Sequence, residues 1–411
     1  MNTHKNIIRK AAISLLLFAL YILPLYSQNI SSAELKEAID GVVSAAGCDV
    51  SVAVVSAARY DALYSYEPDV KLIPASITKL VTSATAIVKL GTGFQFKTVI
   101  YTDDFKMSNG VINGNIYIKG FGDPDFNSDD LAKLSSEIAK LGIKSILGNM
   151  IYDESYLDDN YRGLTNGFRS DTDPQYWPYV SALNIDKNTG IKNPAFYTAN
   201  ALVNALSDAG IEFKGIIVQG IVPQGAKELV RKQRSLMSVI NNMNKQSDNH
   251  SAITLFKVLG AELKSAPGTL AKGEEAVNDF LTSIGVSRSD FSIYEGSGLT
   301  RFSQVTSNLY IQLLKYFYDR VDDFDTFYKS LPVGGVDGTL RNRMKGTEAE
   351  KNVHAKTGTL NRVSSLTGYA VDRDNELIMF YINMNNFSND AAKQRKRQDQ
   401  ICDYLCRFSR N

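Results

Sequence analysis

The feature that most constrains this 411-residue chain is a serine placed three positions before a lysine at the expected start of a helix. Ser76 and Lys79 precede apolar residues at helical spacing, and Gly91 is the expected end of that helix. Residues three apart share one helix face, so the Ser76 hydroxyl and the Lys79 amine can meet at the first turn. A serine needs a base to become a good nucleophile, and a lysine can serve if burial or a nearby cation lowers its pKa from about 10.4.

Two later stretches distinguish this pair from the polar first turn of an ordinary helix. Residues 247–249 have the sequence S-D-N, and residues 356–359 have the sequence K-T-G-T. The motifs S-x-x-K, S-D-N and K-T-G, in this order, are together typical of penicillin-binding proteins and class A β-lactamases. Each motif is weak evidence alone, but the three together predict an acyl-transfer site with Ser76 as its nucleophile.

The composition is that of a globular protein. Hydrophobic residues make up 44% and charged residues 22% of the chain, whose length is enough for one large domain and a smaller one. The formal net charge of +1 gives no reason to expect nucleic-acid binding. No His/Cys cluster has metal-ligand spacing, so we expect neither a metal nor another cofactor.

The first 27 residues have the character of a secretory signal peptide. A basic start precedes mostly apolar residues 11–26, and small Ser27 follows them. We therefore expect cleavage near Ser27, export, and a periplasmic location. An uncleaved membrane anchor is the alternative, because the apolar run approaches spanning length, and peripheral membrane association also stays open.

Three cysteines are present: Cys48, Cys402 and Cys406. An exported chain can form disulfides, so one pair could bridge and leave one thiol over. Three buried thiols are the alternative.

The expected elements divide the chain into two parts. Strands near both ends, at 50–66 and 354–383, flank a helical middle, and these predict an antiparallel sheet covered by helices in an α+β fold. The strand that begins at residue 50 is expected to be half-buried, and a helix is expected at 304–318. Between the first two motifs the character changes to short strands and turns. We predict a discontinuous catalytic domain, residues 28–96 and 221–411, with a smaller α/β domain inserted at 97–220.

Within the predicted insert, residues 111–118 and 146–152 are each expected to form one strand, with a helix at 131–141 between them. Both strands contain Gly-Asn followed by apolar residues, which suggests a two-fold repeat. Residues 160–178, which include the single tryptophan, Trp177, are expected to form a long loop.

Beyond the three motifs, four longer stretches resemble the D-alanyl-D-alanine carboxypeptidase/DD-endopeptidase family, the class C low-molecular-mass penicillin-binding proteins. They are residues 120–124 (GFGDP), 151–156 (IYDESY), 296–301 (GSGLTR) and 332–340 (PVGGVDGTL). The resemblance covers nearly the whole chain after the leader. It implies the fold shared by penicillin-binding proteins and serine β-lactamases, an antiparallel sheet flanked by helices with an all-helical region.

The resemblance also implies the function. It indicates cleavage of D-Ala-D-Ala ends or cross-links of peptidoglycan stem peptides through an acyl-enzyme, with β-lactam antibiotics as covalent inhibitors. Ser76 would be the nucleophile and Lys79 its general base. Ser247 would pass a proton to the leaving amine, and Asn249 would hold the substrate amide.

The third motif would bind the end of the substrate. By the same resemblance, Lys356 and Thr357 would hold the terminal carboxylate, and Lys356 would help to keep the lysine base neutral. Gly358 would let the substrate lie against the strand. The backbone N–H groups of Thr359 and Ser76 would form the oxyanion hole.

Two further residues in family-like stretches are predicted to recognise the third residue of the stem peptide. Asp153 would pair with an ammonium group of its side chain and Arg301 with a carboxylate. The alternative is a local turn carboxylate and a structural arginine.

The chain departs from the family pattern in two places. Glu295 stands where the family usually has Asp before G-S-G-L. Residues 181–184 are followed almost at once by 193–195, where family members often insert a further small β-domain. No role of that domain can be transferred to this chain.

Three other classes of protein fit the sequence less well. A β-lactamase would need a deacylating carboxylate on a short loop, whereas a whole domain separates the first two motifs here. An inactive peptidoglycan-binding module is disfavoured because all motif residues are present. A Ser-His-Asp hydrolase would need a catalytic histidine, but His250 and His354 each adjoin a motif already explained, and G-x-S-x-G does not occur. The balance between carboxypeptidase and endopeptidase activity stays open.

Overall fold

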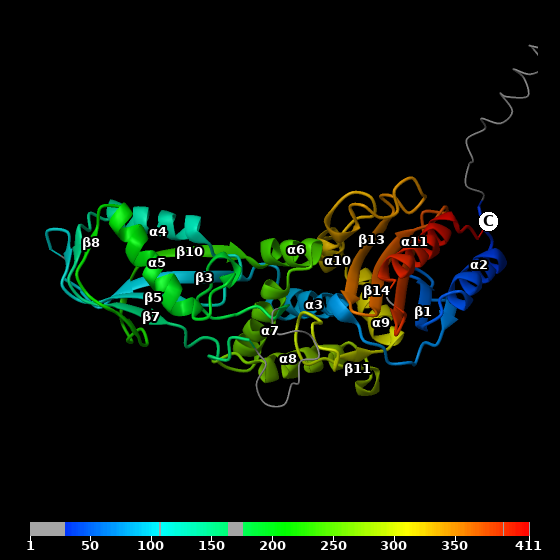
Figure 1. The fold of residues 1–411 in the computed structure, drawn as a ribbon, viewed down its shortest axis with the longest axis horizontal. Coiled ribbons are helices and arrows are strands. Elements are labelled where there is room, and N and C mark those ends of the chain that lie inside the picture. The colour runs from blue at the N-terminus through cyan, green and yellow to red at the C-terminus, as the bar shows by residue number, and fades with distance from the viewer. Residues whose placement is uncertain (1–28, 107, 163–175, 389, 411) are drawn as a thin grey trace, which may run out of the picture.

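The computed structural model describes residues 29–106, 108–162, 176–388 and 390–410. The expected leader, residues 1–27, lies outside this part of the chain, as does most of the expected loop at 160–178. Figure 1 shows an elongated molecule with two lobes, each built on a sheet, and helices between the two sheets. No helix among the described residues is both long and apolar enough to cross a membrane.

Both ends of the chain build the sheet of the larger lobe. Its five strands are antiparallel throughout, in the order β13-β14-β15-β1-β2. They are β1 (Asp49–Ser56), β2 (Ala62–Tyr66), β13 (Val353–Leu360), β14 (Val363–Val371) and β15 (Leu377–Asn385). The predicted antiparallel sheet made from both chain ends is therefore confirmed, with β1 beside β15.

Helices cover both faces of this sheet. They are α2 (Ser32–Ser44) and α11 (Ala391–Arg407) on one face, and the helical middle with α9 (Ser307–Tyr318) on the other. Successive side chains of a strand point to opposite faces. Val52 and Val54 join the core under α2 and α11, whereas Ala53 joins the core on the other side. The strand predicted to be half-buried is thus buried on both faces, because the helical middle covers the second one.

The helical middle forms a wall behind the sheet. Its other members are α3 (Thr78–Leu90), α6 (Leu236–Gln246), α7 (Asn249–Leu263), α8 (Leu270–Ser283) and α10 (Val321–Ser330). All residues of α3 from Thr78 to Ile87 are buried, so this helix is a central part of the wall. The helix predicted at 304–318 begins only at Ser307, because Gln304–Val305 (β12) pairs with Phe291–Ser292 (β11).

The smaller lobe holds a second five-stranded sheet in the order β10-β3-β5-β7-β9. Its strands are β3 (Gln95–Thr102), β5 (Ile116–Gly120), β7 (Met150–Asp153), β9 (Ile217–Gln219) and β10 (Lys227–Ser235). The strands β5, β7 and β9 are parallel, and such strands need long crossover connections. These contain α4 (Ser128–Lys140) and α5 (Pro194–Asp208), whose apolar residues share one core with the sheet.

The strand β10 extends the insert beyond its predicted end, because it belongs to the sheet of the smaller lobe. The sequence placed the end at residue 220, but β10 pairs with β3 from Lys227 beside Thr102 to Ser235 beside Gln95. We therefore propose an insert of residues 95–235 in place of 97–220, and call it the insert lobe. The catalytic lobe is the rest of the described chain.

A strand–glycine–strand unit occurs three times in the insert lobe, rather than twice. The first strands of the units form a small parallel sheet of β4 (Val111–Ile112), β6 (Ser145–Ile146) and β8 (Glu212–Phe213). A Cβ added at Gly148 would lie 2.2 Å from the carbonyl oxygen of Gly114, and one at Gly215 would lie 2.1 Å from that of Gly148. The strands predicted at 111–118 and 146–152 are therefore each two short strands, bent where the units stack.

Candidate active site

Ser76 and Lys79 meet at the start of α3, as their spacing predicted. Ser76 lies in a short 3-10 turn, Ala75–Ile77, that leads into the helix. Lys79 Nζ is 2.9 Å from Ser76 Oγ, and the lysine side chain is fully buried while the serine is half-buried. Ala75 has a φ of 52°, which is strained for a residue other than glycine and is characteristic of functional sites. The turn thus leaves the hydroxyl accessible and keeps the amine inside.

Three acceptors surround the Lys79 amine. Besides the serine hydroxyl, they are Asn249 Oδ1 at 2.8 Å and the carbonyl oxygen of Ser297 at 2.7 Å. Burial lowers the pKa of Lys79 to about 8, although the charges of Glu295 and Asp248 act in the opposite direction. An amine with such a pKa is neutral in a useful fraction of molecules near neutral pH, so it can accept the serine proton.

The S-D-N motif connects two helices, as the sequence predicted. Ser247 ends α6 in a left-handed conformation with a φ of 59°. Asp248 caps α7 by accepting the backbone N–H groups of His250 at 3.0 Å and Ser251 at 3.3 Å. Ser247 Oγ accepts a hydrogen bond from Lys356 Nζ at 2.8 Å. The motif therefore links the helical wall to the K-T-G-T strand.

The K-T-G-T motif lies on β13, the edge strand of the larger sheet. Burial holds the pKa of Lys356 well below its usual value, and the nearby Lys79 adds to this effect. Thr357 Oγ1 donates to Thr339 Oγ1 at 2.8 Å, and Thr359 is exposed. An edge strand offers backbone groups to which an extended peptide can bind.

Gly358 allows the K-T-G-T strand to approach the turn that carries the nucleophile. A Cβ added at this position would lie 2.1 Å from Ser365 Oγ, 2.7 Å from the carbonyl oxygen of Pro74 and 3.0 Å from the backbone nitrogen of Ser76. Any side chain would therefore push β13 away from Ser76. The sequence explained this glycine by space for substrate, and contact between two protein segments is a further reason for it.

Glu295, which the sequence marked only as a departure from a family pattern, organises the loop behind the nucleophile. Its buried carboxylate accepts the backbone N–H groups of Ser297 at 2.6 Å and Thr300 at 3.4 Å. A Cβ on Gly298 would lie 1.9 Å from the carbonyl oxygen of Ala75, so the loop packs directly on the nucleophile turn. The loop thereby supports the serine and presents a carbonyl group to its lysine partner.

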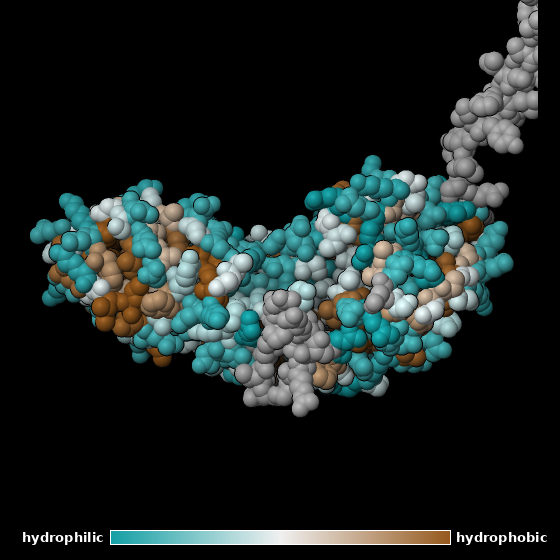
Figure 2. Space-filling model, viewed as in Figure 1, coloured by the Kyte–Doolittle hydropathy of each residue, from teal (hydrophilic) through white to brown (hydrophobic). Residues whose placement is uncertain are grey.

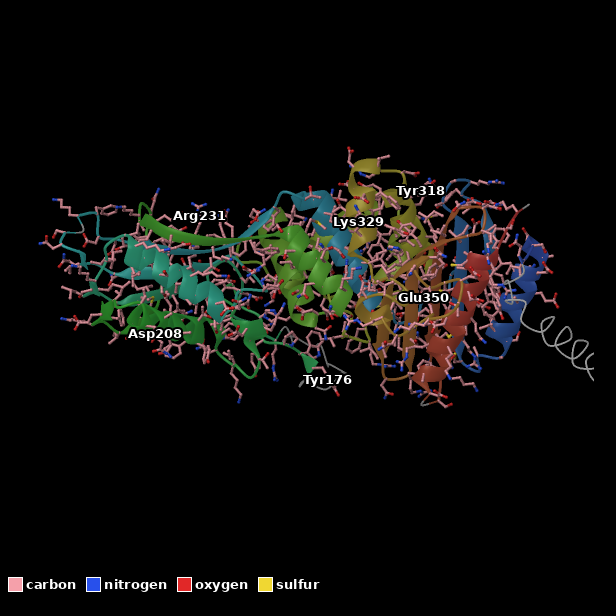
Figure 3. The ribbon with its side chains drawn as sticks, turned by 90° about the horizontal axis from the view of Figure 1, so that it is seen from above. Tyr176, Asp208, Arg231, Tyr318, Lys329 and Glu350 are labelled. Atoms are coloured by element: carbon pink, nitrogen blue, oxygen red, sulfur yellow. The ribbon has the colours of Figure 1, made fainter. Side chains whose placement is uncertain are left out.

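A pocket of about 610 Å³ opens beside the S-D-N motif. Its lining includes Ser247 and Asn249 from the motif and Tyr176, Tyr179 and Lys187 from the insert lobe. Figure 3 shows Tyr176 near the middle of the long axis, where the two lobes meet. The pocket therefore adjoins the acyl-transfer residues and has room for part of a peptide.

Comparison with known proteins identifies the family. A sequence profile of the D-Ala-D-Ala carboxypeptidase 3 (S13) family matches residues 28–192 and 188–407. The chain belongs to this family. The D-alanyl-D-alanine carboxypeptidase of Actinomadura sp. (strain R39) is 27% identical in an alignment that is 438 residues long with its gaps and covers 85% of this chain and 81% of that protein. The D-alanyl-D-alanine carboxypeptidase DacB of Haemophilus influenzae is 25% identical in an alignment of 472 residues with its gaps, which covers 97% of this chain and 96% of that protein.

Solved structures share the fold of this S13 family member. Penicillin-binding protein 4 of Haemophilus influenzae matches with a TM-score of 0.78 and 24% identity, over 89% of this chain and 98% of that one. A predatory endopeptidase of Bdellovibrio bacteriovorus, acylated by penicillin G, matches with a TM-score of 0.57 and 20% identity, over 86% and 91%. The predicted α+β penicillin-binding-protein fold is confirmed.

The structure places Asp153 in a buried polar network of the insert lobe. Its side chain is fully buried in the insert lobe and accepts hydrogen bonds from Lys119 Nζ at 2.9 Å, the Val222 N–H at 2.9 Å and the Ser155 N–H at 3.0 Å. Burial raises the pKa of Asp153, but these hydrogen bonds outweigh burial and lower it. These contacts favour the alternative interpretation, a local structural carboxylate, and the contact with a substrate ammonium remains a prediction.

Arg301 lies beside the K-T-G-T strand. Its Nη1 donates to the carbonyl oxygen of Asn361, at 2.8 Å, in the turn that follows β13. This position is compatible with a role at the substrate, and that role remains a prediction.

The other groups considered in the sequence lie outside the acyl-transfer chemistry of this S13 protein. Burial lowers the pKa of His250 to about 3 and that of His354 to about 4, so neither is poised as a base. Cys48 is a half-buried free thiol, and Cys402 and Cys406 are buried free thiols, so of the two alternatives for the cysteines the structure has three thiols and no bridge among them. Within the described ranges, no group of three or more His, Cys, Asp or Glu side chains could hold a metal ion.

Proposed function

We propose that this S13 family member cleaves peptidoglycan stem peptides through an acyl-enzyme on Ser76, as a serine-type D-Ala-D-Ala carboxypeptidase, a DD-endopeptidase, or both. The observation that carries the proposal is the 2.9 Å contact between Ser76 Oγ and the buried amine of Lys79. Family membership and the names of the relatives support the substrate class.

In the first half of the reaction Lys79 takes the proton of Ser76, and Oγ attacks the carbonyl carbon of the penultimate D-alanine. The negative charge that develops on the carbonyl oxygen is stabilised by the backbone N–H groups of Ser76 and Thr359. The burial of Lys79 favours its neutral form, which is the form that can accept the proton.

The tetrahedral intermediate then loses its amine. Lys356 and Thr357 bind the terminal carboxylate, and Asn249 holds the amide of the acyl part. Ser247, whose oxygen already accepts a hydrogen bond from Lys356, passes its proton to the leaving nitrogen as the C–N bond breaks, and it recovers a proton from the Lys79 ammonium, which becomes neutral again. Water next attacks the ester and gives a proton to the neutral Lys79, which passes it to Ser76 Oγ as the ester bond breaks, and the serine hydroxyl is restored.

Fluorescent penicillin tests the nucleophile, because a β-lactam resembles acyl-D-Ala-D-Ala and forms a stable ester. The unaltered protein should be labelled, and Ser76→Ala should not. Labelling that persists in Ser76→Ala would show that another residue is the nucleophile.

The two peptidase activities are separated by substrate. Purified protein is incubated with muropeptide monomers and with cross-linked dimers, and the products are identified by mass. Loss of one D-alanine from monomers demonstrates carboxypeptidase activity, and conversion of dimers to monomers demonstrates endopeptidase activity. Intact substrates in both reactions would contradict the proposal.

We also propose that the protein is exported to the periplasm, with residues 1–27 as a cleaved leader. The basic and then apolar sequence of this segment supports the proposal. The mass of the protein isolated from the periplasmic fraction should fit a start near residue 28. An intact N-terminus in the membrane fraction would favour an anchor, and release by salt would indicate peripheral association.

A further inference from the structure

A lysine of the insert lobe reaches the S-D-N motif from an unusual turn. Asp186, Lys187 and Asn188 have φ angles of 47°, 58° and 52°. This left-handed conformation is unfavourable for lysine and is better tolerated by Asp and Asn, but three such residues in a row persist only where the surroundings hold them. The Asp186 N–H donates to the carbonyl oxygen of Phe126 at 3.0 Å, and Asn188 Oδ1 accepts the Ile185 N–H at 2.8 Å. The turn is therefore fixed to the insert lobe.

The ammonium group of Lys187 connects carboxylates of the two lobes. It pairs with Asp125 of the insert lobe and with Asp248 of the S-D-N motif, and it donates to Ser251 Oγ at 2.8 Å. The lysine side chain is only 33% exposed, so the pairs are less screened by water than those on an open surface. Figure 2 shows a hydrophilic surface where the lobes meet, in agreement with a polar junction.

Asp248 connects Lys187 to the catalytic side chains through its two neighbours in the chain. Ser247 accepts a hydrogen bond from Lys356, and Asn249 accepts a hydrogen bond from Lys79. As the N-cap of α7, Asp248 also fixes the direction in which the chain enters that helix. Any shift of Asp248 would consequently move both neighbours relative to the base.

Charged groups also connect Asp248 to the base. Lys79 is faced by Glu295 from the loop behind the nucleophile, by Asp248 from the S-D-N turn and by Lys356 from β13. Burial lowers the pKa of Lys79, and the two carboxylates raise it. The negative charge on Asp248 therefore raises the pKa of the base, Lys79.

Lys187 compensates that charge. Asp248 is faced by Lys187 from the insert lobe and by His250 from its own helix. Burial raises the pKa of Asp248, but the ion pair and hydrogen bond with Lys187, together with the hydrogen bond from Ser251 and the charge of His250, outweigh burial and lower it to about 2. Lys187 is itself shared with Asp125, so a fixed cation of the insert lobe stands beside the acyl-transfer site.

We infer that Lys187 is a positioning residue for acyl transfer, which binds Asp248, couples the insert lobe to the S-D-N turn and sets the geometry of the Ser76–Lys79 pair. This inference rests on the proposed function, because it gives Lys187 a part in the reaction at Ser76. If the inference is correct, the insert lobe increases the rate of acylation, in addition to any contact that it makes with peptidoglycan.

The test compares full-length variants in acylation by fluorescent penicillin. Lys187→Met should slow acylation about ten- to hundredfold, the scale expected when reacting groups are slightly misplaced. Lys187→Arg keeps the charge and the hydrogen bonds, so it should keep most of the rate. Lys192→Met is the matched control, because Lys192 is an exposed lysine of the same connection before α5, and it should behave as the unaltered protein.

The pH profile and the melting temperature separate positioning from a loss of folding. In Lys187→Met the uncompensated charge of Asp248 should move the rising limb of the acylation rate to higher pH. If this variant is unstable, Lys187→Gln, which can still donate a hydrogen bond but has no charge, should show the same displacement. A lower Tm with an unmoved limb, or acylation at the rate of Lys192→Met, would overturn the inference.

The same series distinguishes this inference from the proposed function. Ser76→Ala is labelled alongside the lysine variants. If Ser76→Ala still binds penicillin covalently, the proposed nucleophile is wrong and the inference falls with it. If Ser76→Ala is unlabelled while Lys187→Met matches its control, the inference alone is refuted.

Discussion

The pH dependence of acylation gives a quantitative test of the Ser76–Lys79 pair. A lysine at its ordinary pKa of about 10.4 would be neutral in roughly 0.04% of molecules at pH 7. Burial lowers the pKa of Lys79 to about 8, so about 10% of molecules hold the neutral amine at that pH. The supply of active base is thus roughly 250 times larger, which corresponds to about 3 kcal/mol.

The rate of acylation should therefore rise about tenfold per pH unit below about pH 8 and level off above it. The sign follows from the role of the amine, because only its neutral form accepts the serine proton. The assay measures the rate constant for labelling by fluorescent penicillin below saturation, at constant ionic strength, between about pH 5.5 and 9.5. A rate that still rises steeply at the upper end, or that is flat across the range, would refute the assignment of Lys79 as a base with a lowered pKa.

One substitution extends this test. Glu295→Gln removes a negative charge that raises the pKa of Lys79, while an amide oxygen can still accept the Ser297 N–H. The midpoint of the profile should therefore move to lower pH. Glu37→Gln, on the exposed side of α2, is the matched control and should leave it unchanged. An identical midpoint in both variants would show that Glu295 does not act on the base.

Three further predictions concern individual positions. Gly358→Ala should reduce the rate of acylation about a hundredfold or more, because its Cβ would push β13 away from the nucleophile turn. The control is Gly41→Ala, where an added Cβ has no atom within 4 Å, and this variant should leave the rate unchanged. Equal rates in the two variants would contradict the close approach of β13 to the turn. Asp153→Asn should lower the free energy of unfolding in urea by about 1–3 kcal/mol, because Lys119 loses a charged partner, and should leave penicillin acylation intact. An unchanged free energy of unfolding, with slower hydrolysis of stem peptides whose third residue carries an ammonium group, would instead support its predicted role at the substrate. Arg301→Ala should slow hydrolysis of stem peptides whose third residue carries a carboxylate but leave penicillin acylation nearly unchanged, and an equal loss on both would indicate a structural arginine.

The acyl-transfer motifs could be predicted because the signal for each is local. The three-residue spacing of Ser76 and Lys79 on a helix determines that their side chains can meet. Likewise, the S-D-N triplet lies at a helix–helix connection that periodicity alone could locate. What the spacing could not give is the position of the three motifs relative to one another, such as the contact between Lys356 and Ser247. That information came from the resemblance to a family.

Other features could not be predicted, because they depend on contacts between distant segments. The strand β10 is mostly polar, with Leu229 and Val230 as its apolar residues, and its pairing with β3 is what places it in the smaller sheet. The environment of the Asp153 carboxylate depends on Lys119, 34 positions away, which donates a hydrogen bond to it. The third copy of the repeat was missed because it lacks the asparagine of the other two, although Gly215 packs in the same way.

The neighbouring positions of β1 and β15 have a consequence for the timing of synthesis. The insert lobe is made of strands that all lie within residues 95–235, so it can fold while the remainder is still being translated. The larger sheet cannot close until residue 385 has left the ribosome, because β15 joins the β13-β14 hairpin to β1. Such long-range pairing is slow, and until it occurs β1 keeps an unpaired edge. A nascent chain therefore carries Ser76 and Lys79 without a complete acyl-transfer site until the distant strands β13 to β15 have been made.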